Sequence, residues 1–388
     1  MTKFGVGISE HPEAAVAAGE ALGQISDRFE GERPDLTVAF FTPQHLSQSR
    51  NIANAIHEIL MPRAAIGASV SGVIGGGQSI EAGPGISIWA AKLDGVRVTT
   101  MLLDTSSSLD GGEVRGWPDH GCEAGTLILL ADPFSFPLDR FLASLNVNLP
   151  EVAVAGGFVS AGVAPEVNRL IADLSTAGRG AVGVLVEASP LIDTAVIEAS
   201  RPIGKAFTVT AAEAGTIFEL GGKPALERLE ETFNEIDVES KRLMSAGMQL
   251  GTVLNEQQDE FGPGDFQVRD LAGADESDKS ITTGEVVEVG QTVQFHVRDP
   301  AAAQEKLSRT LSAGDDSASA LVFAPMGAGI ADEVLAGDLH RSGGGAVYRP
   351  CIAGAYCAGQ AGRIGNATAP TGGNRLFPDA VTLATFGI

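Results

Sequence analysis

The 388 residues are too many for one typical hydrophobic core, so two domains or one large duplicated unit are expected. The formal net charge is −23 and the acids are spread along the chain, which argues against nucleic acid and anionic membrane as partners, because both need clustered Lys and Arg. Glycine is in excess, at 49 residues against roughly 27 expected from about 7% usage, which predicts many tight turns.

The cysteines and the apolar runs exclude several other classes. Cys122, Cys351 and Cys357 form neither a disulfide framework nor a metal motif, so a reduced, cytoplasmic location is expected. The N-terminus carries Glu10 and Glu13 and no apolar run, unlike a signal peptide. No apolar segment approaches the roughly 18 residues of a membrane-spanning helix, so no membrane partner is expected.

The first 200 residues contain one order of elements twice. The first copy is predicted as a helix over 12–29, strands over 36–41 and 64–70 with a helix from Ser47 between them, and a hairpin of 86–91 and 96–103. The second copy is predicted as a strand over 126–131, a helix over about 137–146, and strands over 180–187 and 194–198. This order indicates a duplicated unit of helices and strands.

The second half is predicted to start with a hairpin and a helix. The hairpin joins 206–210 to 216–220, and the helix starts at Pro224 with Leu226, Leu229 and Phe233 facing inward. Residues 255–280 are acidic and irregular, with one strand at 266–271. A strand over 292–297, a helix from Asp299–Pro300 and a strand over 318–323 follow, and the last begins a third copy of the repeat.

Glycine turns follow three of the predicted strands. They lie in Ile66–Gly72, Val154–Gly162 and Cys351–Gly365, and each has a β-type entry, small or hydroxyl residues, and a glycine. Glycine permits positive φ and close approach of a ligand or of another chain segment. Because repeated motifs in a duplicated fold usually occupy equivalent ends, the three turns are expected to converge around a ligand cleft.

Four stretches carry a family resemblance: Ala65–Gly72 in the first half, and Ala206–Leu229, Val287–Asp299 and Cys357–Gly362 in the second. They resemble the FIST family, in which N-terminal and C-terminal FIST domains are paired. The resemblance implies a bacterial or archaeal intracellular sensory module that binds small ligands such as amino acids. Some similar family members bind haem and sense nitric oxide.

The expected fold is α+β, with duplicated mixed β-sheet layers flanked by helices in two FIST-type halves. Residues 1–33 are expected to form a helical lead-in, 34–204 the N-terminal domain and 205–388 the C-terminal domain. Since these domains take up the whole sequence, the signal is expected to pass to a separate signalling protein. A homodimer is left open.

The expected ligand is a small molecule such as an amino acid or a carboxylate. Its candidate binding residues come from the three turns and from one strand end, and they are Ser69, Ser71, Gly72, Ser160, Gly162, Arg298, Cys357, Gly359 and Gln360. Gln360 and Val73 stand where the family commonly has glutamate, which implies a changed or lost ligand. In the other interpretation, residue 360 only satisfies backbone groups in its turn.

Two stretches match a nucleotide-binding or catalytic motif only in part. Gly72–Ser79 fits a P-loop except that Gln78 replaces the lysine and a β-like stretch follows where a helix is required. Phe158–Gly162 lacks the first glycine of a nucleophile elbow, so Ser160 is interpreted as a turn hydroxyl. No nucleophile or acid–base constellation is visible, so binding without catalysis is expected, with an uncharacterised enzyme as the weaker alternative.

Neither a metal site nor a cofactor is expected, because no two of the six histidines have a metal-site spacing. Haem is the alternative cofactor, since a single histidine can ligate its iron. His296, in an alternating strand, is either a hydrogen-bonded strand residue or that ligand. Cys357 is interpreted as a packed thiol. Arg298 either binds a carboxylate ligand or pairs with a neighbouring acid.

Overall fold

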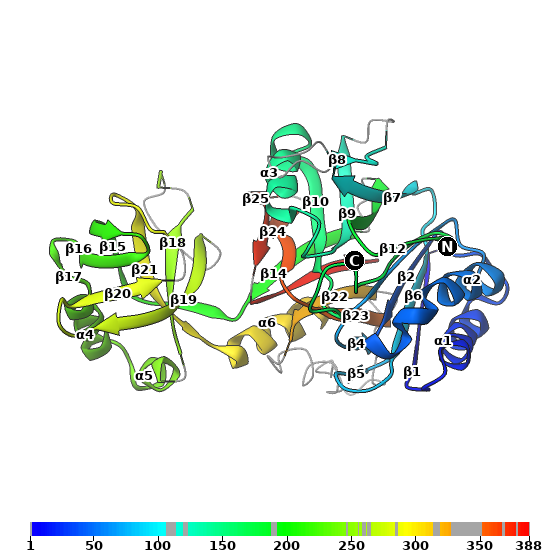
Figure 1. The fold of residues 1–388 in the computed structure, drawn as a ribbon, viewed down its shortest axis with the longest axis horizontal. Helices are drawn as coiled ribbons and strands as arrows, with labels where there is room; N and C mark the ends of the chain where they lie inside the picture. Colours follow the sequence, from blue (N-terminus) through cyan, green and yellow to red (C-terminus); the bar gives the residue numbers. More distant parts are fainter. Residues whose placement is uncertain are drawn as a thin grey trace. The chain divides into compact units, whose positions relative to one another are not determined.

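The computed structural model describes residues 2–105, 114–118, 123–187, 192–245, 247–254, 256–257, 261, 265–283, 286–312, 319–326, 351–366, 369–377 and 379–387. The chain forms two compact units (Figure 1). The first combines Met1–Ile197 with Gln304–Ile388, and the second is Glu198–Ala303. These units cut across the sequence-based division at residue 204, because the C-terminal strands pair within sheets of the first unit.

The described residues of the first unit form three mixed sheets, each built around one parallel pair of strands. The pairs are β2 (Leu36–Phe41) with β3 (Ala64–Ser69), β9 (Ala124–Ala131) with β10 (Glu151–Phe158), and β22 (Ser319–Pro325) with β23 (Cys351–Cys357). The first strand of each pair has an antiparallel neighbour, which is β6 (Ile86–Lys92), β13 (Ala181–Glu187) or β26 (Ala380–Phe386). The three sheets therefore share one plan.

Each parallel pair is extended by a hairpin from another repeat. The hairpin after β3, formed by β4 (Val73–Gly75) and β5 (Gln78–Ile80), pairs with β23. The hairpin after β10, formed by β11 (Leu170–Ala172) and β12 (Ser175–Ala177), pairs with β3. The hairpin after β23, formed by β24 (Gln360–Asn366) and β25 (Ala369–Phe377), pairs with β10. The three repeats thus exchange hairpins in a closed cycle.

Outer strands and helices complete the first unit. The outer strands are β1 (Lys3–Ser9), β7 (Val98–Thr105), β8 (Val114–Arg115) and β14 (Ile192–Glu198). The helices are α1 (Ala14–Phe29), the 3₁₀-helix η1 (Pro43–Gln48), α2 (Ser49–Ile59) and α3 (Leu138–Asn148). Helices α1 and α2 cover the first sheet, with Leu22, Ile25 and Phe29 buried as their helical spacing predicts. None of the described helices has both the length and the apolarity to cross a membrane.

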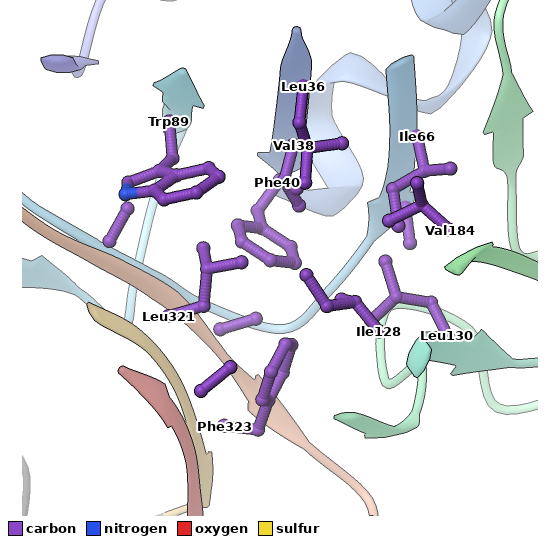
Figure 2. Close-up of a cluster of buried hydrophobic side chains, with 14 of the residues drawn as sticks. Leu36, Val38, Phe40, Ile66, Trp89, Ile128, Leu130, Val184, Leu321 and Phe323 are labelled. Carbon is purple, nitrogen blue, oxygen red and sulfur yellow. The ribbon is translucent and has the colours of Figure 1, made fainter. Parts of the chain in front are cut away.

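Side chains from all three sheets meet in one apolar core. Figure 2 shows Leu36, Val38, Phe40 and Ile66 of the first sheet beside Ile128, Leu130 and Val184 of the second and Leu321 and Phe323 of the third. Trp89 on β6 is fully buried and donates its Nε1 proton to Ser319 Oγ at 2.7 Å. Several of these strands are buried on both faces, which explains why they are nearly continuous apolar runs.

The second strand of each parallel pair contains a glycine that allows close approach to the first strand. A β-carbon added to Gly67, Gly156 or Gly354 would lie 2.8, 1.9 or 1.9 Å from the carbonyl oxygen of the residue paired with it. No side chain fits at the two shorter distances without a shift of the backbone. Some of the many glycines therefore serve close contacts between strands, and not tight turns.

The described strands of the second unit form a closed six-stranded barrel. Its strands are β15 (Ser200–Glu213), β21 (Thr292–Arg298), β18 (Met248–Val253), β19 (Phe266–Asp275), β20 (Ser280–Thr283) and β16 (Thr216–Leu220), and β16 pairs back with β15. Phe207, Val293 and Phe295 lie in its core. The strand β17 (Lys223–Pro224) and the helices α4 (Ala225–Glu235) and α5 (Val238–Met244) belong to this unit, and α6 (Pro300–Ser312) contains the boundary between the units.

The predicted α+β class, with mixed sheets flanked by helices, is confirmed. The first 33 residues are more than a helical lead-in, because β1 lies at the edge of the first sheet and pairs with β6 over its whole length. The sequence Gly72–Ser79 forms the hairpin of β4 and β5, with Gly76 and Gly77 in the left-handed region at φ of 58° and 82°. It therefore lacks the strand–loop–helix geometry of a P-loop.

Candidate functional site

The three glycine turns meet at the hydroxyl group of Ser160. Its oxygen accepts a hydrogen bond from the Ser71 backbone N–H at 2.8 Å and lies 2.5 Å from the Tyr356 carbonyl oxygen. The Tyr356 N–H in turn donates to the Gly72 carbonyl at 3.1 Å, and the Phe158 N–H donates to the Gly359 carbonyl at 2.8 Å. We call Ser71, Gly72, Ser160, Tyr356 and Gly359 the turn junction. The predicted convergence of the turns is confirmed, whereas the ligand cleft stays a prediction.

A hydroxyl group has one proton, which limits what Ser160 can do. The Tyr356 carbonyl at 2.5 Å is a closer acceptor than Ser71 Oγ at 3.1 Å, so the proton is assigned to the carbonyl. Ser160 then serves as a donor to the third turn and as an acceptor for the first. Ser71 is half-buried, and its own hydroxyl proton can point to the second lone pair of Ser160 Oγ, 3.1 Å away, or to a ligand. Ser71 is thus the polar group of the junction best able to contact a ligand.

Ser69 lies at the end of β3 and has a supporting position. It is fully buried, its Oγ accepts the Arg169 N–H at 2.8 Å, and its own N–H donates to the Arg169 carbonyl at 2.8 Å. This pair of hydrogen bonds fixes the chain leading into the second hairpin against the first sheet. Ser69 therefore holds the turn in place and is closed to solvent.

Gly162 begins a buried polar chain that sequence reasoning missed. Its N–H donates to Asn168 Oδ1 at 2.7 Å, and Asn168 Nδ2 donates to Asp132 Oδ1 at 2.9 Å. Ser135 Oγ donates to the other oxygen of Asp132 at 2.6 Å. Asn168 and Asp132 are both fully buried, so this chain satisfies polar groups inside the second repeat.

Gly72 and Gly162 allow close approach of other chain segments, and none of the three turn glycines supplies a positive φ. Gly72, Gly162 and Gly359 are all outside the left-handed region. A β-carbon on Gly72 would lie 2.7 Å from the Ile80 carbonyl oxygen, and one on Gly162 would lie 2.8 Å from the Val167 side chain. At Gly359 the nearest atom is 3.4 Å away, which is ordinary contact. Gly359 therefore does not use the positive φ that glycine permits.

Gln360 and Cys357 are closed to solvent behind the third turn. The Gln360 side chain is fully buried, with Nε2 donating to the Cys357 carbonyl at 3.1 Å and Oε1 accepting the Ala380 N–H at 3.3 Å. Gln360 thus hydrogen-bonds backbone groups, which is the second of the two interpretations that the sequence allowed. Burial raises the pKa of the Cys357 thiol to about 12, so it stays protonated near neutral pH. Val73 is a buried residue of β4 paired with Ala355.

Arg298 belongs to the second unit, whereas the turn junction lies in the first. Its Nη2 lies 3.3 Å from Asp270 Oδ1, and its neighbour Asp299 is paired instead with Arg201 at 3.1 Å. The half-exposed Arg298 therefore pairs with an acid of the adjoining barrel surface, as one sequence interpretation allowed.

His296 also lies in the second unit and is 2% exposed. Its Nδ1 is 2.9 Å from Ser200 Oγ, and its Nε2 faces Gly251, where an added β-carbon would lie 2.5 Å away. The Phe266 ring packs edge-on at 4.8 Å, and burial lowers the pKa of His296 to about 4. Among the described residues no group of His, Cys, Asp and Glu is arranged to hold a metal ion. His120, His340 and Cys122 lie outside the described residues.

A groove in the second unit was not predicted. It has a volume of about 430 Å³ and is lined by Leu226, Leu229, Glu230, Phe233 and Asn234 of α4, Met244 of α5 and Met248 of β18. The sequence placed Phe233 in the core, but its side chain is 42% exposed. Helical spacing identified the apolar face of α4, and only the packing of α5 and β18 shows that this face is incompletely covered.

Comparisons with known proteins identify the same family over most of the chain. Residues 35–223 match the FIST N domain and residues 225–363 match the FIST C domain. An uncharacterised protein of Mycobacterium bovis is 35% identical over 309 residues, which cover 80% of this chain and 79% of that protein. An uncharacterised protein of Mycobacterium tuberculosis is 36% identical over 305 residues, which cover 79% of each chain. The chain belongs to the FIST family, with a FIST N domain followed by a FIST C domain.

Proposed function

We propose that this chain is a small-molecule-binding sensory protein whose ligand contacts the turn junction. FIST domains are sensory modules implicated in signal transduction. The observation that supports this location is the Ser160 hydroxyl group, which hydrogen-bonds the first and third turns at once. A ligand that adds or removes a hydrogen bond here acts on three sheets together. Such a differential contact is what a ligand needs to shift a conformational equilibrium.

An amino acid or another small carboxylate suits the chemistry of the junction. The Ser71 hydroxyl is half-buried and has a proton to donate, and a carboxylate oxygen is a strong acceptor for it. Ser69, Cys357 and Gln360 are buried and support the turns from behind. The proposed role is binding without catalysis, with the signal passed to a separate protein.

Calorimetric titration of the full chain with a panel of amino acids and small carboxylates tests this proposal. Ser71→Ala should weaken binding of the best ligand about tenfold or more, since a hydrogen bond to a charged group contributes roughly 1.5–3 kcal/mol and about 1.4 kcal/mol is a factor of ten. Ser26→Ala, at a half-buried position on α1, is the matched control and should leave the affinity unchanged. Equal affinity in both variants, or no binding across the panel, would exclude this ligand class at Ser71.

Haem is less favoured than a colourless ligand because of the position of His296. Its Nε2 is covered by Gly251 and its ring by Phe266, so iron reaches the imidazole only if the barrel surface opens. The absorbance spectrum of protein reconstituted with haem separates the two readings. A sharp Soret band in the wild type that His296→Ala abolishes would favour the haem sensor.

A further inference from the structure

We infer that the groove between α4, α5 and β18 binds a small molecule with an apolar body and a protonated amine. The groove volume of about 430 Å³ lies within the 300–1,000 Å³ typical of small-molecule sites. Five of its seven lining residues are Leu, Phe or Met, which contact an apolar body well. This site lies wholly in the second unit and does not depend on the turn junction.

Glu230 supplies the preference for positive charge. It is the one ionised side chain among the lining residues, and it makes no hydrogen bond or ion pair with any described residue. The next residue, Glu231, is held by Lys223 at 2.6 Å and by Arg228 at 2.9 Å. The two neighbouring carboxylates thus differ, since one is already neutralised by the protein and the other faces the groove with its charge available.

The ring of Phe233 contributes apolar surface to the groove and already has a cation of the chain beside it. The Lys241 ammonium group lies 5.3 Å from the centre of the Phe233 ring, which is within the range of a cation–π interaction. Because Lys241 occupies this ring, the ligand ammonium group is assigned to Glu230 alone, and Phe233 contacts the apolar body. Met244 and Met248 adapt their flexible side chains to the shape of the apolar body.

The chain offers its own reporters for this site. Its six methionines include Met244 and Met248 in the groove, and Met61 and Met326, which are 46% and 57% exposed. In the full chain labelled with ¹³C-methyl methionine, phenethylamine should shift the resonances of Met244 and Met248 and leave those of Met61 and Met326 in place. Phenethyl alcohol and 3-phenylpropionate, which share the ring but lack the amine, should bind several-fold more weakly.

Two variants of one helix test the charge. Glu230→Gln should weaken phenethylamine binding about two- to fivefold, the effect expected for one ion pair at an exposed carboxylate. Glu227→Gln, also on α4 but outside the groove lining, should leave the affinity unchanged. The inference is overturned if the Met244 and Met248 resonances do not move, if the alcohol binds as tightly as the amine, or if both variants behave alike.

Discussion

Both the nitrogen and the oxygen of the Gln360 side-chain amide form hydrogen bonds with backbone groups. A carboxylate at this position could accept hydrogen bonds but could not donate one. Glutamate would put an oxygen opposite the Cys357 carbonyl, where Nε2 now donates at 3.1 Å. We expect Gln360→Glu to lower the free energy of unfolding by about 1–3 kcal/mol at pH 7, the cost of an unsatisfied buried polar group. Chemical denaturation measures this loss. Gln78→Glu, at an exposed position of β5, is the control and should change stability little.

The pH dependence gives a second check on the same variant. Burial should raise the pKa of the new carboxyl group above its unfolded value. Its stabilising protonated form is then fully present below the unfolded pKa and is lost as pH rises through the folded pKa. The penalty should therefore shrink towards low pH. A penalty that is the same at pH 4 and pH 7 would show that residue 360 is open to water.

His296 predicts a pH dependence of the opposite sign. Its pKa is about 4 in the folded chain against 6.5 for the free side chain, so below pH 6.5 the unfolded chain binds the proton more tightly. The stability it contributes is present above pH 6.5 and is lost as pH falls towards 4, by roughly 3 kcal/mol in full. His296→Phe should remove this part of the acid sensitivity, measured by denaturation at pH 7 and pH 4.5. An unchanged difference between the two pH values would contradict the burial of the imidazole.

Expectations about single residues were confirmed where the alternation of side chains along a strand determines which face a residue lies on. The alternation of Phe295, His296 and Val297 placed the histidine on the face opposite the barrel core, as observed. The φ angle of Gly359 could not be read from its identity, because glycine also serves where another chain segment comes close. At Gly72 that segment is β5 and Tyr356, which no local pattern reveals.

At the scale of the turns, the three glycines should respond differently to one added methyl group. Gly72→Ala places a β-carbon 2.7 Å from the Ile80 carbonyl, so the hairpin must shift, at a cost of about 1–3 kcal/mol. Gly359→Ala meets no atom closer than 3.4 Å and should change stability by less than about 0.5 kcal/mol. Thermal unfolding of the two variants checks this order. If Gly359→Ala is the more damaging change, then the turn contacts described above are wrong.

The order of strands and helices followed from periodicity, but their partners did not. Helices α1 and α3 lie close to the ranges predicted for them, because their apolar residues recur at helical spacing. The strand expected at 266–271 continues to Asp275, where exposed residues give no alternation to extend it. The groove beside Phe233 was missed for a related reason, since an apolar helix face looks the same in sequence whether it is covered or open.

For the whole molecule, repeated motifs predicted the convergence of the turns but not the exchange of hairpins. Ile66–Gly72 and Val154–Gly162 resemble each other in sequence because both end a buried strand and lead into a short hairpin. Which sheet receives that hairpin depends on pairings such as Ala355 with Val73, far apart in the chain. Pairing between distant strands leaves no mark in a single sequence.

Coupling of the three turns through Ser160 is tested most directly by hydrogen–deuterium exchange of the full chain. Ser160→Ala removes the hydroxyl group that hydrogen-bonds the Ser71 N–H and the Tyr356 carbonyl. Exchange should therefore accelerate over 72–80 and 356–366 as well as 159–169, while helix α4 of the second unit stays unchanged. Ser175→Ala, at an exposed position on β12, should alter none of these segments. Acceleration confined to 159–169 would contradict a shared junction.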